Sequence, residues 1–181
     1  MLWDGYSDLL LGSVSVRDEE AYNIVGPIYM QLGLAVSPDD CSLALRGLQT
    51  LALRLDQLEK STLKIALWLS ENNIIHEVYH PAFKSCPGHD IWKRDFTGSA
   101  SVFSFTFVDN VTSKQVETFI NALHIFKIGL SWGGVTSLAV VYPDLVRPNK
   151  DFGGRLVRLN IGLEAVDDLI NDLELAISNI N

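Results

Sequence analysis

The chain has 181 residues, and its 22 acidic side chains against 14 basic ones give a formal net charge of −8 at neutral pH. This acidic balance argues against a general affinity for nucleic acid or for an anionic membrane surface, because both attract positive charge. The length fits one domain of ordinary size, or one domain with an added arm, and a hydrophobic content of 48% is typical of globular proteins. Cys41 and Cys86 are the only cysteines, which excludes a disulfide-rich scaffold. We therefore expect a globular protein of the cytoplasm.

The first part of the chain, residues 1–35, is predicted to be a short arm. The run Leu9–Val16 is apolar on both faces and is predicted to be a buried strand. An apolar helical pattern follows it and ends near Gly33. A buried strand needs neighbours on both sides, and the arm does not supply them. We therefore expect other polypeptide, from upstream or from another chain, to cover this strand.

Residues 36–73 are predicted to form one long helix. Ser37 is a suitable N-cap and Pro38 suits the first helical position, and acidic residues follow at the positive end of the helix dipole. Apolar residues then recur at spacings of three and four, namely Ala44, Leu48, Leu51, Leu55, Leu58, Ile65 and Leu69. Gly47 weakens the helix locally. A connector between two globular parts and a core helix of a bundle both fit this pattern.

Residues 74–181 alternate between strand and helix patterns, which predicts a two-layer α/β domain with a mostly antiparallel sheet and helices on one face. The expected strands are residues 74–79, 103–107, 125–130, 137–141 and 156–161. The run Thr112–Gln115 is a capping box that begins a helix, and an amphipathic helix follows Glu164. The segment from His80 to Ala100 shows no periodicity, and loops of that length usually serve function or interaction.

Arg158 is the most informative single residue, because it lies in the middle of the last predicted strand. Its guanidinium group suits bidentate binding of a carboxylate or phosphate. It shares a face of the strand with Leu156 and Asn160, and a covered guanidinium group needs a partner. An arginine that faces solvent on an open sheet explains the same pattern, so both interpretations stay open.

The run Ser131-Trp132-Gly133-Gly134 directly follows a predicted strand. Two glycines allow a ligand to approach main-chain N–H groups closely, and a pair of such groups can hold an anion. A plain turn is the alternative, and Trp132 fits a core aromatic position equally well. No metal site is predicted, because His80, Cys86 and His89 do not follow a known zinc-binding spacing.

Several stretches of the chain form a recognisable series, namely residues 5–8, 11–12, 46–51, 80–82, 87–98, 131–134 and 157–164. The run Trp92–Gly98 within them has the sequence Trp-Lys-Arg-Asp-Phe-Thr-Gly. In their order and spacing these stretches resemble the C-terminal part of the pyridoxal-phosphate-dependent enzymes of Cys/Met metabolism, and the run Trp92–Gly98 resembles the bacterial cystathionine β-lyase branch in particular. The resemblance covers essentially the whole chain.

The resemblance implies part of a fold-type I subunit. Residues 1–35 would be a remnant of the large cofactor-binding domain, residues 36–73 the connecting helix, and residues 74–181 the small C-terminal α/β domain. It also implies that Arg158 binds the α-carboxylate of the substrate and that Ser131 and Trp132 assist it.

The implied reaction is a carbon–sulfur β-elimination with pyridoxal phosphate as electron sink. It converts cystathionine to homocysteine, pyruvate and ammonia, in transsulfuration and methionine biosynthesis. The implied ligand is therefore a cystathionine-like sulfur amino acid. We also expect association with a large domain or between copies of the chain.

The sequence departs from the family pattern at several positions. The lysine that forms the internal aldimine lies four residues ahead of the glycine in a Gly-His-Ser-Asp stretch, which here reads Gly5-Tyr6-Ser7-Asp8, so its position corresponds to Met1. Leu130 stands where close relatives have a tyrosine. We therefore expect no catalytic residue, no cofactor-binding residue, no covalently bound pyridoxal phosphate and no activity from this chain alone. The alternative function is a non-catalytic amino-acid-binding or interaction module.

Overall fold

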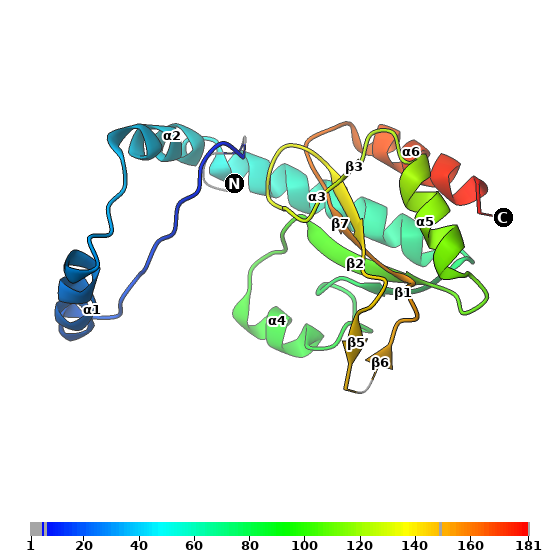
Figure 1. The fold of residues 1–181 in the computed structure, drawn as a ribbon, viewed down its shortest axis with the longest axis horizontal. Helices are drawn as coiled ribbons and strands as arrows, with labels where there is room; N and C mark the ends of the chain where they lie inside the picture. Colours follow the sequence, from blue (N-terminus) through cyan, green and yellow to red (C-terminus); the bar gives the residue numbers. More distant parts are fainter. Residues whose placement is uncertain (1–4, 6, 149, 181) are drawn as a thin grey trace. The chain divides into compact units, whose positions relative to one another are not determined.

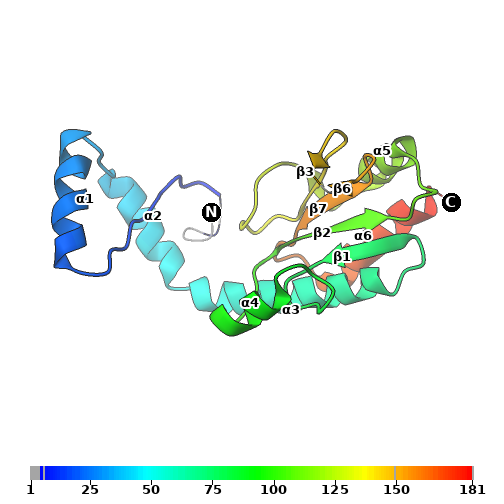
Figure 2. The ribbon, with the colours of Figure 1, turned by 90° about the horizontal axis from the view of Figure 1, so that it is seen from below.

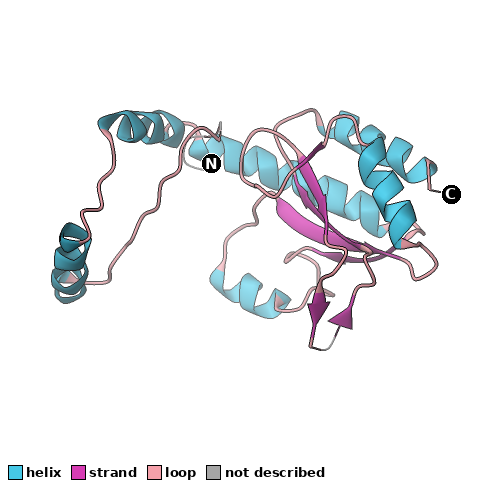
Figure 3. Ribbon diagram, in the orientation of Figure 1, coloured by secondary structure: helices cyan, strands magenta, loops and turns pink. Residues whose placement is uncertain are grey.

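The computed structural model describes residues 5, 7–148 and 150–180, and these fall into two compact units, 1–51 and 52–181 (Figure 1). Figure 3 shows their helices, strands and loops. No helix within the described residues combines the length and the apolar character that a membrane crossing requires. The two units are described separately below.

The first unit contains two helices, α1 (Glu19–Gln31) and α2 (Pro38–Leu48). Both begin at a capping side chain: the Asp18 carboxylate accepts a hydrogen bond from the Ala21 N–H, and the Ser37 hydroxyl accepts one from the Asp40 N–H at 3.0 Å. The Ser37 cap and the helical pattern before Gly33 confirm two of the predictions from sequence, whereas the Asp18 cap was not predicted. None of the side chains of α1 is buried within this chain.

The strand predicted over Leu9–Val16 is not formed, so this prediction was wrong. Its residues have no regular secondary structure, and the side chains of Leu10 and Val14 are 92% and 78% exposed. A strand is stable only when a neighbour pairs with its N–H and C=O groups. The described residues of the first unit provide no second strand to do so.

The long helix predicted over residues 36–73 is interrupted, so the prediction of one continuous helix was also wrong. α2 ends at Leu48, and the next helix, α3, spans Leu51–Ser70. Between them Thr50 donates hydrogen bonds to the Gly47 carbonyl from its N–H at 3.2 Å and from its hydroxyl at 3.4 Å. Glycine has a low helix propensity, which makes a break near Gly47 inexpensive.

The second unit is built on a five-stranded sheet with the strand order β1-β2-β7-β4-β3. All neighbouring pairs are antiparallel except β3 and β4, which are parallel. This confirms the mostly antiparallel sheet expected from sequence. The strands are β1 (Ile75–Tyr79), β2 (Val102–Phe107), β3 (Lys127–Ile128), β4 (Leu138–Val141) and β7 (Leu156–Asn160).

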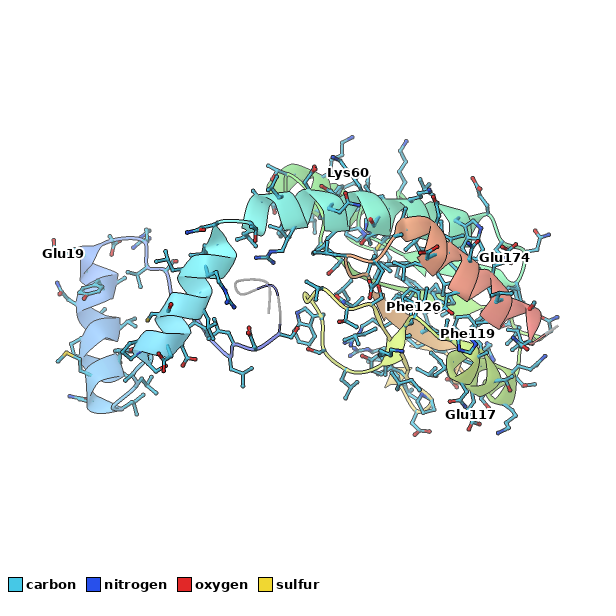
Figure 4. The ribbon with its side chains drawn as sticks, turned by 90° about the horizontal axis from the view of Figure 1, so that it is seen from above. Glu19, Lys60, Glu117, Phe119, Phe126 and Glu174 are labelled. Carbon is cyan, nitrogen blue, oxygen red and sulfur yellow. The ribbon has the colours of Figure 1, made fainter. Side chains whose placement is uncertain are left out.

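Helices α3, α5 (Ser113–Ala122) and α6 (Val166–Ser178) pack on one face of this sheet, which confirms the two-layer α/β architecture (Figure 2). Side chains from all three helices join one core with alternate residues of the strands. α5 begins with the predicted capping box, in which the side chains of Thr112 and Gln115 each bond to the backbone of the other. Figure 4 shows Phe119 and Phe126 turned into this core, whereas Lys60, Glu117 and Glu174 point away from it.

Side-chain alternation determines what the other face of the sheet carries. Phe103, Phe105 and Phe107 of β2 are buried in the core, as are Val157 and Leu159 of β7. Successive residues of a strand point to opposite faces. The intervening residues, which include Ser104 and Arg158, therefore lie on the face opposite the helices.

Two short elements were not predicted from sequence. Helix α4 (His89–Asp95) lies within the segment that was expected to be an irregular loop, and it begins at Gly88, whose φ angle is 84°. A small hairpin pairs β5 (Val146–Arg147) with β6 (Lys150–Asp151). Both elements are too short to produce a periodic pattern of apolar residues. The strand expected over 125–130 is limited to Lys127–Ile128.

His80 is a polar residue inside the hydrophobic core. Its side chain is 0% exposed and packs against the rings of Phe83 and Phe103. Its Nδ1 accepts a hydrogen bond from the Ala82 N–H at 3.2 Å, so the proton of the neutral ring lies on Nε2, which has no hydrogen-bond partner among the described residues. Burial lowers the pKa of His80, and the nearby Glu59 carboxylate only partly opposes this effect.

We therefore predict that His80 makes the stability of the chain depend on pH. An unfolded histidine has a pKa of about 6.5, so below that pH the unfolded chain binds a proton that the folded chain excludes. Stability should fall as the pH drops below about 6.5, by at most about 1.4 kcal/mol per pH unit from this group. Urea unfolding at pH 7.5 and 5.5 measures this loss of stability. The proteins compared are the wild type, His80→Asn and the control His124→Asn. An equal loss of stability in His80→Asn and the wild type would contradict the prediction.

Candidate functional site

The candidate site lies on the sheet face opposite the helices, around Arg158 in the middle of β7. Arg158 is paired in register with Ser104 of β2 on one side and Val140 of β4 on the other. It is therefore flanked by strands on both sides. Its side chain is half-buried.

The loop that follows β3 holds the guanidinium group of Arg158. Its Nη2 donates hydrogen bonds to the carbonyl oxygens of Leu130 at 2.6 Å and Ser131 at 3.3 Å. The rings of Trp132 and Tyr142 have their centroids 5.8 and 5.9 Å from its Cζ, within the range of a cation–π contact. The Nε atom is buried and has no hydrogen-bond partner in the described part of the chain.

Arg158 differs in its partners from other arginines of the chain. Arg17, Arg46, Arg94 and Arg155 each form an ion pair with an aspartate. Over the residues that the structure describes, no carboxylate pairs with Arg158, although the chain is strongly acidic. Main-chain carbonyls orient this guanidinium group but do not neutralise its charge. A carboxylate ligand could do so.

The loop from Leu130 to Thr136 is fixed in its middle by Asn160, which lies on the same strand as Arg158. The Gly133 N–H donates a hydrogen bond to Asn160 Oδ1 at 2.8 Å, and Asn160 Nδ2 donates one to the Thr136 carbonyl at 3.1 Å. Gly133 has a φ angle of 78°, which glycine adopts without strain. Of the two interpretations of the glycine pair, anion binding does not hold for the Gly133 N–H, because this group is bonded to Asn160 within the protein.

The end of the same loop is clamped to the turn after β7. The Glu164 carboxylate accepts hydrogen bonds from the N–H and the hydroxyl of Ser137 at 2.8 and 2.7 Å, and the Gly162 N–H donates to that hydroxyl at 2.8 Å. A Cβ atom at Gly162 would lie 2.2 Å from the Val135 carbonyl oxygen. Only glycine allows this close approach of the two backbones. The loop is therefore held by β7 and the turn that follows it.

The structure brings together the three residues that the sequence analysis selected for substrate binding. Ser131 and Trp132 both lie in the loop that contacts Arg158. Trp132 is 55% exposed, so the alternative of a core aromatic was wrong. The side chain of Leu130, whose carbonyl oxygen binds the guanidinium group, is 66% exposed. The predicted equivalence of Met1 to the aldimine lysine lies outside the described residues, as does Tyr6.

Sequence reasoning missed Asn160 and Tyr142 as parts of this site. Asn160 was recognised only as sharing a face with Arg158, and the spacing of two between them is the signal that could have indicated a common role. Tyr142 follows β4 directly and gave no such signal.

A second polar cluster on the same sheet face involves Glu77 and Tyr79 of β1 and Lys150 of β6. Lys150 Nζ donates a hydrogen bond to Glu77 at 2.8 Å and contacts the Tyr79 hydroxyl, which itself donates to Glu77 at 2.6 Å. Burial and the Glu77 carboxylate raise the pKa of Tyr79, and the bond to Glu77 raises the pKa of Lys150. Burial alone would raise the pKa of Glu77, but the hydrogen bonds from Lys150 and Tyr79 lower it. These three groups bind one another and attach the hairpin to the sheet.

The described residues also bear on the question of a metal site. No group of three or more His, Cys, Asp or Glu side chains within them is arranged to hold a metal ion. In the segment 80–100, His89 Nδ1 is hydrogen-bonded to the Pro81 carbonyl at 2.8 Å.

Comparison with known proteins shows which family this chain comes from. Residues 3–178 match the family described as Cys/Met metabolism PLP-dependent enzyme. The chain belongs to this family. It is 38% identical to a cystathionine beta-lyase of Haemophilus influenzae and 32% identical to an L-alanine/L-glutamate racemase of Wolbachia pipientis, and each match covers 97% of the chain.

The structural comparison gives the same family and the same partial coverage. A cystathionine gamma synthase from Xanthomonas oryzae pv. oryzae, solved in complex with aminoacrylate and cysteine, superposes with a TM-score of 0.88 at 30% identity over 99% of this chain. The match covers 48% of that chain, and the sequence matches cover 46% of the lyase and 44% of the racemase. The chain thus spans about half the length of these relatives. Together with the mixed sheet and its helices, this confirms the fold class as the C-terminal domain of a fold-type I enzyme.

The described residues do not by themselves fit a covalently held pyridoxal phosphate. A Schiff base needs a lysine beside the substrate site. Within the described residues, no lysine forms a hydrogen bond or ion pair with Arg158 or its loop. The amino groups of Lys60, Lys64, Lys114, Lys127 and Lys150 instead bind Asp56, Asp167, Glu117, the His124 carbonyl and Glu77.

Proposed function

We propose that this chain supplies the substrate-carboxylate side of the active site of a pyridoxal-phosphate-dependent carbon–sulfur lyase. The proposed reaction is the β-elimination of cystathionine to homocysteine, pyruvate and ammonia, in transsulfuration and methionine biosynthesis. Arg158 would bind the α-carboxylate of the amino acid, and Ser131 and Trp132 would flank it.

The observation that carries this proposal is the state of the Arg158 guanidinium group. It is oriented by the Leu130 and Ser131 carbonyls, it has no carboxylate partner among the described residues, and its buried Nε–H is unpaired. The guanidinium group thus carries a positive charge that is held in place and is not neutralised within the described residues, and a ligand carboxylate would neutralise it.

The names of the relatives support an amino-acid ligand. The racemase is named for L-alanine and L-glutamate, and the synthase was solved with cysteine. These amino acids differ in their side chains but share the α-carboxylate. An arginine that binds this shared group would serve all of these reactions. The choice of cystathionine for the present chain follows from its similarity to the β-lyases.

We predict that the chain binds L-methionine, a small sulfur amino acid, through Arg158. A hydrogen bond to a charged group contributes about 1.5–3 kcal/mol, so Arg158→Ala should weaken binding by at least about tenfold. Arg158→Lys should also bind weakly, because the ammonium group cannot replace the planar guanidinium group. Isothermal titration calorimetry measures the affinities, with Arg147→Ala, a change at an exposed hairpin arginine, as the matched control. Equal heats of binding for Arg158→Ala and the wild type would remove Arg158 from the site.

We predict that the chain alone releases no pyruvate from cystathionine when pyridoxal phosphate is added. The reason is that Met1 stands at the position that the family pattern assigns to the aldimine lysine. A lactate-dehydrogenase-coupled assay measures pyruvate, and the control is cofactor with substrate but without protein. Release above this control would contradict the prediction. If the chain binds methionine without releasing pyruvate, a non-catalytic amino-acid-binding module remains the alternative function.

We propose that the chain associates, either with a large cofactor-binding domain or with other copies of itself, through the apolar side chains of its first unit. Leu10, Val14 and Met30 are among those exposed there, at 92%, 78% and 78%. Exposed apolar patches of this kind usually mark interaction sites. We predict that light scattering at rising concentration gives a mass above that of a monomer, and that Leu10→Ser with Met30→Ser reduces it. A strictly monomeric mass at high concentration would contradict self-association.

We place the protein in the cytoplasm, where the thiols of Cys41 and Cys86, both free, would stay reduced.

A further inference from the structure

Asn160 is buried in the sheet, and both ends of its side-chain amide are occupied. The residue is 1% exposed. Its Oδ1 accepts hydrogen bonds from the Gly133 N–H at 2.8 Å and the Ser101 hydroxyl at 2.9 Å, and its Nδ2 donates to the Thr136 carbonyl at 3.1 Å. One side chain thus contacts the middle and the end of the loop that carries Ser131 and Trp132.

The loop is attached to β7 at two positions two residues apart. Arg158 holds its start through the Leu130 and Ser131 carbonyls, and Asn160 holds the remainder. Trp132 lies between these two attachments, and its ring centroid is 5.8 Å from the Cζ of Arg158. Without the bonds from Asn160, the loop would be held only at its start, by Arg158, and at its end, by the clamp at Ser137. The middle of the loop, which includes Trp132, would then lose its attachment to β7.

The chemistry of the amide explains why asparagine suits this position. It presents an acceptor to two donors and a donor to one carbonyl, all from one buried group. An aspartate would keep the acceptor but would face the Thr136 carbonyl with a second oxygen. It would also place a negative charge near the Arg158 guanidinium group, where it would compete with a ligand carboxylate.

We propose that Asn160 is a positioning residue, which sets the affinity of the site for an amino-acid carboxylate by fixing the loop Leu130–Thr136 against Arg158. The proposal rests on the proposed function, because it assigns to Asn160 the geometry of the same site. Its effect acts through Arg158 and Trp132 and not by contact with the ligand.

The test compares Asn160→Ala, which adds no charge, with Ser101→Ala by calorimetry with L-methionine and by urea unfolding. Asn160→Ala removes both bonds to the loop, whereas Ser101→Ala removes one of the hydrogen bonds to Asn160 but leaves both bonds to the loop. We expect Asn160→Ala to weaken binding at least tenfold and Ser101→Ala to change it less than threefold, even where both lose stability. Similar affinities for Asn160→Ala and the wild type would overturn the proposal. So would equal losses of affinity in the two variants, because that would indicate a general structural effect.

A second measurement is hydrogen exchange of the wild-type chain, which requires no ligand and no folded variant. In the wild type, the Gly133 amide should exchange with solvent as slowly as the core amides of β7, because Asn160 holds it. Exchange at the rate of an open loop would overturn the proposal. If the wild type does not bind methionine, the proposed function fails, and the exchange of the Gly133 amide then reports only whether Asn160 holds the loop.

Discussion

The account of this chain depends on one interaction, the hydrogen bonding of the Arg158 guanidinium group to the main chain of the loop before β4. Carbonyl oxygens of Leu130 and Ser131 hold the group in place, and the rings of Trp132 and Tyr142 flank it. Neutral acceptors orient a cation without cancelling its charge. The result is a preorganised positive group, which binds a carboxylate without first losing its own conformational freedom.

The rest of the second unit places this group. Alternation along β2 and β7 sends Phe105 and Leu159 into the core under the helices, and it sends Ser104 and Arg158 to the opposite face. Because β7 lies between β2 and β4, Arg158 is supported on both sides. Glu164 and Gly162 then clamp the end of the loop through Ser137. The loop is irregular in conformation, yet its ends and its middle are tied to regular structure.

Patterns that involve neighbouring residues could be predicted from the sequence. The capping box of Thr112 and Gln115 and the alternation of Phe103, Phe105 and Phe107 need only local chemistry, and both are present in the structure. The position of Arg158 on a face opposite the core follows from the same alternation. The clustering of Arg158 with Ser131 and Trp132 did not come from local pattern. It was implied by the resemblance to a family of enzymes. The comparisons confirm that the chain belongs to this family.

The features that escaped prediction depend on distant partners. Asn160 acts on Gly133, which is 27 residues away in sequence, and nothing in the local sequence indicates that contact. Leu9–Val16 has the composition of a strand, but a strand also needs a neighbour, and none pairs with it in the described residues. The break after Gly47 depends on a turn closed by Thr50, which the helical periodicity of the flanking residues conceals.

The most direct test is the resonance of the Arg158 Nε–H in a ¹⁵N-correlated NMR spectrum during titration with an amino acid. Arg158→Lys, which lacks this group, assigns the signal. L-Methionine should shift the Nε–H resonance in a saturable way, whereas 3-(methylthio)propylamine, which has the same side chain and amine but no carboxylate, should leave it unchanged. A resonance that neither compound moves, or that both move equally, would contradict the claim that this guanidinium group binds a carboxylate.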